Sequence, residues 1–213
     1  MCIGLLLLTE GLYRFTNVPD FDQPFTDQHN FGNYVDLLLM NKINKGGWVA
    51  INCIPTAAHT IAGALAGKLI LSGKPIIKPM MIWAFVCLII GYGLDIANIT
   101  PIIKRIATSS FTLASLGWCL IGLTACYWWI DLKDHRTHLK FFTIVGMNSI
   151  FIYLFFEILG NWFNKYVGTV TNGLMDFINT PEMLKLIITS VCIFILEWLL
   201  CYFLYKKKIF FKL

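Results

Sequence analysis

Charged residues are scarce in this sequence. They make up 14% of its 213 residues, whereas an ordinary globular protein has about 25%. Hydrophobic residues make up 57%, so a soluble domain of this composition would have too few charges to cover its surface. A disordered chain needs the opposite bias. The composition therefore predicts an integral membrane protein.

Several catalytic signatures are also absent. The sequence contains no G-x-S-x-G, H-E-x-x-H, Walker or Rossmann glycine pattern, so it gives no support for a serine hydrolase, a zincin or a nucleotide-hydrolysing enzyme. It has seven cysteines but no C-x-x-C, and six of the cysteines fall in apolar stretches, where we interpret them as small buried residues. His135 and His138 share a short basic loop, which favours solvated side chains over a metal site.

Five stretches are long and apolar enough to cross a bilayer as helices, which takes about 20 residues each. They are residues 48–67, 79–97, 110–130, 141–163 and 183–205. A sixth apolar stretch, 1–8, is too short and lacks the features of a secretory signal, so we interpret it as the end of a truncated helix. We expect an all-α, polytopic membrane helix bundle in which residues 1–213 form a single, partial transmembrane domain.

The basic residues predict how the chain is oriented. Placing the C-terminus in the cytoplasm puts ten of the seventeen lysines and arginines on that side, in agreement with the positive-inside rule. The net charge of +5 then belongs to basic membrane flanks, and we expect lipid rather than nucleic acid as a partner. The long segment 9–47 falls on the periplasmic or luminal side, where it is either a lid or binding loop or a solvated excursion.

Polar residues follow one face of the first complete span. On a helix these side chains project into a common arc of about 100°. They are Asn52, Thr56, His59, Thr60, Gly63 and Gly67. Because lipid cannot solvate such groups, we expect the face to look into the bundle, with the two glycines allowing close helix approach. His59 is either a hydrogen-bonded packing residue or a ligand-facing proton carrier.

A second polar face lies on the 141–163 span, with Asn148 about 100° away from it. Its residues are Gly146, Ser149, Tyr153, Glu157, Gly160 and Asn161. Glu157 must be protonated, paired or facing water at this depth. For Glu197 in the last span we favour a single interhelical hydrogen bond.

The segment before the third span predicts an anion site. Thr108, Ser109 and Ser110 are natural N-cap residues, so the first backbone N–H groups of the following helix would face the loop. Lys104 and Arg105 stand just ahead of that positive helix end. Together they suit a phosphate or carboxylate, although two basic residues snorkelling to the membrane surface give the same pattern.

Four segments carry a resemblance to a known family. They are Asn30-Phe-Gly-Asn-Tyr-Val-Asp36, the run from Pro101-Ile-Ile-Lys104 to Thr108-Ser-Ser-Phe111, Gly146-Met-Asn-Ser149, and Tyr205-Lys-Lys-Lys-Ile-Phe-Phe-Lys-Leu213. In these segments the chain resembles heparan-alpha-glucosaminide N-acetyltransferase-like membrane proteins. That resemblance implies about ten or eleven spans and transfer of acetyl from acetyl-CoA to the amine of a terminal glucosamine. The family's essential histidine lies near an Asp-x-x-Arg-Gly motif that has no counterpart here, so the chain matches the C-terminal half.

The resemblance also implies roles for individual residues. Lys104, Ser109 and Ser110 would hold an anionic part of donor or acceptor, and Asn148 with its helix would line the central cavity. No residue of this chain is predicted to be catalytic, and His59 is only a candidate base. Acetyl-CoA would be the donor substrate, an amino sugar the acceptor, and an N-terminal half or a second copy the protein partner.

Two other interpretations stay open at this point. One is a small transporter or channel subunit in which His59 and Glu157 relay protons or bind a polar solute. The other is a fragment with no activity of its own.

Overall fold

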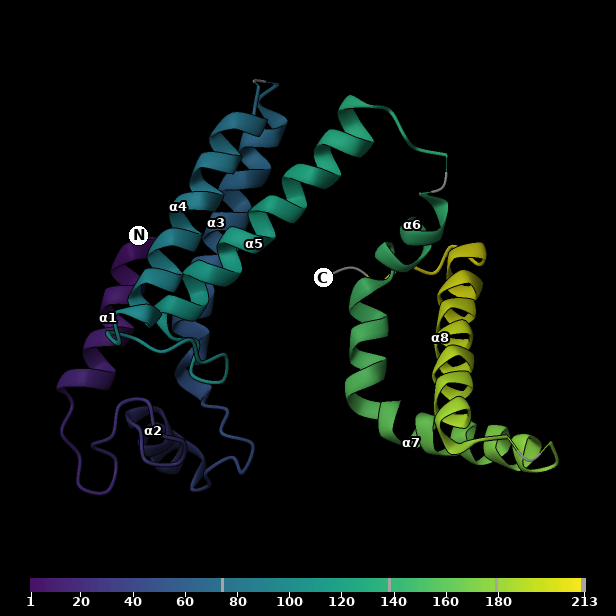
Figure 1. The fold of residues 1–213 in the computed structure, drawn as a ribbon, viewed down its shortest axis with the longest axis horizontal. Coiled ribbons are helices and arrows are strands. Elements are labelled where there is room, and N and C mark those ends of the chain that lie inside the picture. The colour runs from purple at the N-terminus through teal and green to yellow at the C-terminus, as the bar shows by residue number, and fades with distance from the viewer. Residues whose placement is uncertain (74, 138, 179, 212–213) are drawn as a thin grey trace. The chain divides into compact units, whose positions relative to one another are not determined.

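The computed structural model describes residues 1–73, 75–137, 139–178 and 180–211, and these are helical with no strand. The helices are α1 (Cys2–Phe15), α2 (Phe31–Met40), α3 (Cys53–Leu71), α4 (Ile77–Ile96), α5 (Ser109–Tyr127), α6 (Lys140–Gly146), α7 (Ser149–Asp176) and α8 (Glu182–Lys206), with short turns η1 (Ala50–Asn52) and η2 (Trp128–Leu132) beside α3 and α5. The chain forms two compact units, Met1–Asp134 (unit 1) and His135–Leu213 (unit 2). Figure 1 shows the helices of each unit.

Four of the described helical segments are long and apolar enough to cross a membrane, and there are five if the bent pair of α6 and α7 is counted as one span. The four are Ala50–Leu71, Ile77–Ile96, Ser109–Leu132 and Glu182–Lys206. The prediction of an all-α membrane helix bundle is therefore confirmed, and the chain is a multi-pass membrane protein. The spans expected at 79–97 and 183–205 differ from α4 and α8 by at most two residues at either end.

The span expected at 141–163 is not one straight helix. It divides into α6 and α7, which are bent by 64° at their junction, and α7 continues to Asp176. The break falls at Met147 and Asn148, and the Asn148 side chain binds the C-terminal tail instead of solvent or its own helix. Hydropathy alone conceals this break because the residues on both sides of it are apolar.

The segment expected as a loop over 9–47 also contains more helix than predicted. Its first residues continue α1 to Phe15, and α2 occupies its centre. The polar residues that make this part of α1 look like a loop are paired: Glu10 and Arg14 form an ion pair one turn apart at 2.8 Å, and the Thr9 hydroxyl donates to the carbonyl of Leu5. Residues 16–30 and 41–49 connect these helices.

Unit 1 is held together by close packing of α4 against α5. A Cβ atom added to Gly91 would meet the backbone nitrogen of Ala114 at 2.6 Å, and one added to Gly117 would meet the carbonyl of Ala84 at 2.8 Å. Ala84 itself is fully buried. Small residues thus let these two backbones approach closely, as is usual in membrane bundles.

The glycines that we predicted for this role lie elsewhere. Among the described residues, and apart from the adjoining residues and the nearby backbone of α3 itself, no atom comes within 4 Å of a Cβ built on Gly63 or Gly67. The expectation that this pair mediates a close helix contact is therefore wrong for unit 1, because α3 turns its Pro55, Ala58 and Ala66 face to its neighbours instead.

Unit 2 pairs α8 with both α6 and α7. The Phe141 ring stacks on Trp198 with centroids 5.2 Å apart, and the Trp198 Nε1–H donates to the Phe141 carbonyl. Further along, the hydroxyls of Thr171 and Thr189 lie 2.7 Å apart and join α7 to α8. The contacts between the helices of this unit therefore combine ring stacking with single interhelical hydrogen bonds.

Candidate functional site

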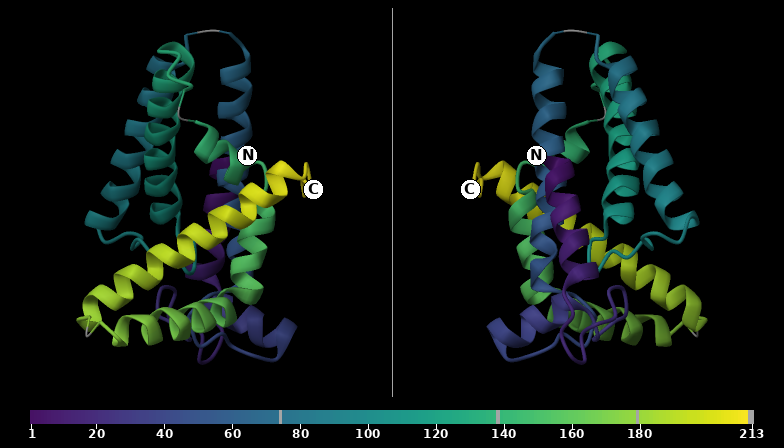
Figure 2. Two further views of the ribbon diagram at one scale, coloured as in Figure 1. Left: turned by 90° about the vertical axis from the view of Figure 1, so that its right-hand side faces the viewer. Right: turned by 90° about the vertical axis from the view of Figure 1, so that its left-hand side faces the viewer.

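The segment 16–49, which contains α2, and the loop 97–108 meet at one end of α3, α4 and α5 (Figures 1 and 2). The Arg105 guanidinium lies 3.7 Å from the Asp27 carboxylate. The Asn52 amide donates to the Arg105 carbonyl at 3.4 Å. The Lys104 ammonium lies 5.6 Å from the centre of the Trp48 ring. We call this region the polar end of unit 1.

A hydrogen-bond network that includes both buried and exposed residues joins α1 to the start of α5. The Glu10 carboxylate accepts hydrogen bonds from Thr100 Oγ1 at 2.6 Å, Ser109 Oγ at 3.0 Å and Arg14 Nε at 2.8 Å. Arg14 also donates to the carbonyl of Ile99. Bonds to a charged group are stronger than neutral ones, so Glu10 fixes the 97–108 loop against α1. We call this set the Glu10 network.

The start of α5 is capped by Thr108, one of the three residues from which the sequence predicted the N-cap. Its hydroxyl accepts from the Phe111 N–H and donates to the Pro101 carbonyl at 2.7 Å. The Ser110 hydroxyl donates to the same carbonyl at 2.8 Å. Ile102 N–H donates to Asp95, so this loop is closed by side chain to backbone bonds at both ends.

These contacts divide the predicted anion site into two buried serines and two exposed basic residues. Ser109 and Ser110 are buried, and their hydroxyls are engaged with Glu10 and Pro101. A carboxylate beside Ser109 disfavours a second anion there. Lys104 and Arg105 are exposed at the polar end, and each has a partner within the chain. Anion binding by these two residues stays a prediction.

A second set of polar groups, the Asp36 cluster of Tyr13, Asn33 and Asp36, is fully enclosed between α1 and α2. Asn33 and Asp36 have no exposed surface, and the Asp36 carboxylate accepts a hydrogen bond from Ala50 N–H at 2.8 Å. Among the described residues, no donor or acceptor reaches the other oxygen of the Asp36 carboxylate, the side-chain amide of Asn33 or the Tyr13 hydroxyl. Burial, and secondarily the Asp36 charge, raise the pKa of the Tyr13 phenol.

Sequence reasoning did not single out Glu10, Arg14 or the Asp36 cluster as site residues. A signal was present in each case. Glu10 and Arg14 are four residues apart, which is the spacing of a helical ion pair. Asn30, Asn33 and Asp36 recur every third residue, so they line one face of a helix that begins with an Asn cap.

His59 is anchored to α5 by a short polar contact. Its Nε2 lies 2.8 Å from the Ser115 hydroxyl, and that hydroxyl donates in turn to the Phe111 carbonyl at 2.7 Å. His59 is half-buried, whereas Thr56 and Thr60 on the same helix are exposed. The predicted polar face of α3 is therefore covered by α5 at His59 and is uncovered at Thr56 and Thr60.

Asn148 is not a cavity residue. Its side chain is fully buried, its amide donates to the Ile209 carbonyl at 3.2 Å, and its oxygen accepts from the Phe211 N–H at 3.2 Å. The expectation that Asn148 lines the central cavity is wrong, because this clamp on the C-terminal tail engages both ends of its amide. Phe151 stacks on Phe211 beside it, with centroids 5.0 Å apart.

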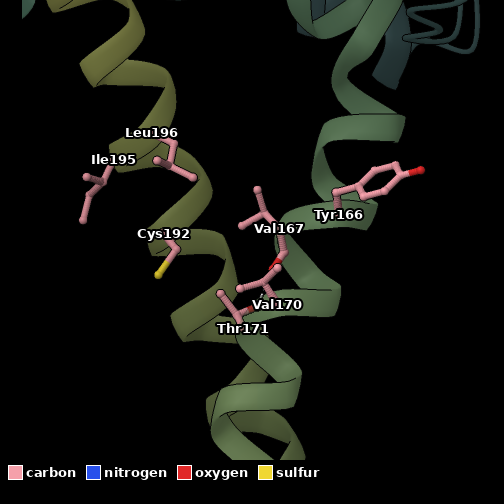
Figure 3. Close-up of a pocket in the computed structure, with 7 residues that line it drawn as sticks. All are labelled: Tyr166, Val167, Val170, Thr171, Cys192, Ile195 and Leu196. Atoms are coloured by element: carbon pink, nitrogen blue, oxygen red, sulfur yellow. Dashed lines mark hydrogen bonds between the residues drawn. The ribbon is translucent and has the colours of Figure 1, made fainter.

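Tyr153 and Glu157 are exposed on α7. They belong to unit 2 and His59 to unit 1. Unit 2 also has an open apolar groove of about 480 Å³ between α7 and α8, and none of the predicted site residues lines it. Figure 3 shows Val167 and Leu196 facing each other across this groove, with the Tyr166 ring directed away from α8.

Among the described residues, no group of three or more His, Cys, Asp or Glu side chains could hold a metal ion; His138 lies outside them. Neither protein-family models nor curated proteins give a match to the chain.

Proposed function

We propose that this chain is part of an integral membrane acetyltransferase similar to the heparan-alpha-glucosaminide N-acetyltransferase-like proteins. It would contribute helices to a polar chamber in which acetyl passes from acetyl-CoA to the amine of an amino sugar. The catalytic histidine would come from outside these 213 residues, since the sequence has no Asp-x-x-Arg-Gly motif. The proposal is supported by the four resembling segments and by the surface of α3.

The observation that carries the proposal is the uncovered polar face of α3. Thr56 and Thr60 are exposed within a segment that is apolar enough to span a membrane. Hydroxyl groups in hydrocarbon find partners or water. The described part of unit 1 leaves this face uncovered, and a substrate chamber completed by further helices would give its hydroxyls polar surroundings.

The chemistry assigns supporting roles to the residues of this chain. Attack of an amine on a thioester needs a base to take the amine proton and donors for the developing oxyanion. His59 is bound to Ser115 and so is better suited to holding the α3 face in position than to shuttling protons. Lys104 and Arg105, exposed at the polar end, would attract the anionic part of donor or acceptor.

The charge distribution gives the orientation that we propose. The polar end carries Glu10 and a series of aspartates, whereas Lys68, Lys78 and Lys133 lie near the other ends of α3, α4 and α5. The positive-inside rule then places the polar end in the periplasm or lumen and the C-terminus in the cytoplasm. Lys74 and Lys212, which contribute to the same bias, lie outside the described residues.

The test is acetyl transfer in reconstituted membranes. The chain is placed in liposomes with labelled acetyl-CoA and glucosamine, alone and together with a co-expressed N-terminal half from a heparan-alpha-glucosaminide N-acetyltransferase-like protein. We expect N-acetylglucosamine only when both are present. Robust transfer by this chain alone would show that its own residues carry the chemistry, and no transfer in either case would contradict the proposal.

Two variants sharpen this experiment. Thr56→Val together with Thr60→Val removes the uncovered hydroxyls and is expected to lower transfer, while Thr169→Val, an exposed control on α7, leaves it unchanged. Proton-coupled uptake by the same liposomes that disappears in Glu157→Gln would instead favour the transporter interpretation.

A further inference from the structure

Helix α2 has its polar side buried and its apolar end exposed. Asn30, Asn33 and Asp36 have no exposed surface, whereas the whole last turn, Leu37 to Met40, is exposed. A helix on the surface of a water-soluble protein shows the opposite arrangement. The polar side is fixed in place, because Asn30 caps the helix and Asp36 binds Ala50 N–H.

The exposed turn is strongly apolar. Leu38, Leu39 and Met40 are 68%, 69% and 57% exposed, and Leu37 adjoins them. Contiguous apolar surface of this kind marks a contact with lipid or with another protein. The turn ends at Asn41, whose left-handed backbone (φ 50°) stops the helix, so these four side chains form the tip of a rigid element.

We propose that α2 is an interfacial helix, and that its Leu37–Met40 turn inserts into the leaflet of the membrane that α3 crosses. Figures 1 and 2 show α2 running across the end of unit 1 rather than along α3, α4 and α5. A helix lying in the membrane surface has this direction. Its contact with the bilayer is independent of the acetyltransferase proposal.

The distance to the bilayer supports this placement. Only residues 41–49 separate α2 from the spanning segment that begins at Ala50, and nine residues reach at most about 30 Å when fully extended. The chain between them is bent, since Gly47 has a positive φ of 75° and a Cβ there would lie 2.5 Å from the Asp27 carboxylate oxygen. The Leu37–Met40 turn therefore remains near the membrane surface.

The residues that follow α2 have the chemistry of a lipid interface. Lys42 and Lys45 are exposed, and their ammonium groups can reach lipid phosphates while their stems lie along acyl chains. Trp48 is 43% exposed at the start of the span, where aromatic residues are enriched.

Lipid fits this turn better than a second copy of the chain does. A stable protein interface takes about 20–30 residues from each side, and one helical turn offers four. Lipid needs no matching surface, and anionic headgroups complement the two lysines. A second copy seated on the turn is instead an outcome that the experiment detects.

The test is photocrosslinking of the full chain in nanodiscs of phosphatidylcholine and phosphatidylglycerol. p-Benzoylphenylalanine replaces Leu38 or Leu39, and in the control it replaces Asp22, which is exposed in the same outer segment. After irradiation, mass spectrometry identifies the adducts. We expect phospholipid adducts at positions 38 and 39 and none at position 22.

Two results would overturn the proposal: equal lipid labelling at all three positions, or adducts of positions 38 and 39 with a second copy of the chain. A further variant guards against misfolding as an explanation. With the probe at position 40, Leu38→Glu should abolish the lipid adduct while far-ultraviolet circular dichroism stays unchanged, because a charge expels the turn from the acyl region. Retention of the adduct would contradict insertion.

Discussion

Replacing Gly91 with alanine should separate α4 from α5, and the structure offers a matched control two residues away. The new Cβ would lie 2.6 Å from Ala114 N and 2.9 Å from the Ser110 carbonyl oxygen, whereas ordinary contact begins near 3.4 Å. Both neighbours are backbone atoms of α5, so no side chain can rotate away. The helices must therefore move apart by several tenths of an ångström.

The cost follows from the packing that this movement loses. Overpacking of a tight interior typically destabilises a protein by about 1–3 kcal/mol, and the better helix propensity of alanine returns up to about 1 kcal/mol. Gly93→Ala has the same propensity change, but apart from the adjoining residues and the nearby backbone of α4 no described atom lies within 4 Å of its Cβ. The difference between the two variants isolates the packing term, about 1–3 kcal/mol.

The assay is SDS titration of both purified variants in mixed micelles, followed by far-ultraviolet circular dichroism. Gly91→Ala should unfold at a lower SDS fraction than the wild type, and Gly93→Ala at the same or a higher one. Equal midpoints for the two variants would refute the close approach of α4 and α5 at Gly91.

Three further predictions concern hydrogen bonds and ionisation. Asn148→Ala removes two hydrogen bonds worth about 1–3 kcal/mol together and should make the C-terminal tail accessible to Lys-C protease. The control Asn161→Ala changes an exposed residue of α7 and should leave the tail protected. Equal cleavage of the two variants would contradict the clamp. Glu10→Gln and Ser109→Ala should each destabilise unit 1 and be non-additive in a double-mutant cycle, while simple additivity of their unfolding free energies would show that the Glu10 network is not coupled. Because the pKa of Tyr13 is raised in the folded state, the contribution of its phenol to stability is complete below the ordinary phenol pKa of about 10 and is lost as the pH rises further. Unfolding midpoints measured from pH 8 to 11 should therefore fall for the wild type and fall less for Tyr13→Phe. Parallel curves for the two proteins would exclude the buried phenol as the cause.

The sequence was sufficient to predict features that depend on local composition. The hydropathy of α4 and α8 defined both helices to within two residues, because a long apolar run needs no partner to be recognised. The N-cap of α5 was placed within Thr108, Ser109 and Ser110 for the same reason, since capping involves only the next turn of the chain, and the structure assigns it to Thr108.

Features that depend on distant partners could not be predicted in this way. Asn148 breaks a helix because its partners are Ile209 and Phe211, about 60 residues further along. Ser109 looked available for an anion because Glu10, about 100 residues before it, lies beside it only in the fold. A helical wheel identifies small residues but not the neighbour they meet, so the close contact was predicted at Gly63 and Gly67 whereas the structure has one at Gly91.

The Asn148 clamp recognises only main-chain atoms of the tail. Any side chain is therefore compatible with hydrogen bonding at positions 209 and 211, provided that the backbone offers a carbonyl at the first and an N–H at the second. Proline is the exception at position 211, because it has no N–H to donate. Sequence variation at these two sites is thus constrained by backbone chemistry, and an imino acid at 211 would remove one of the two bonds of the clamp even with Asn148 intact.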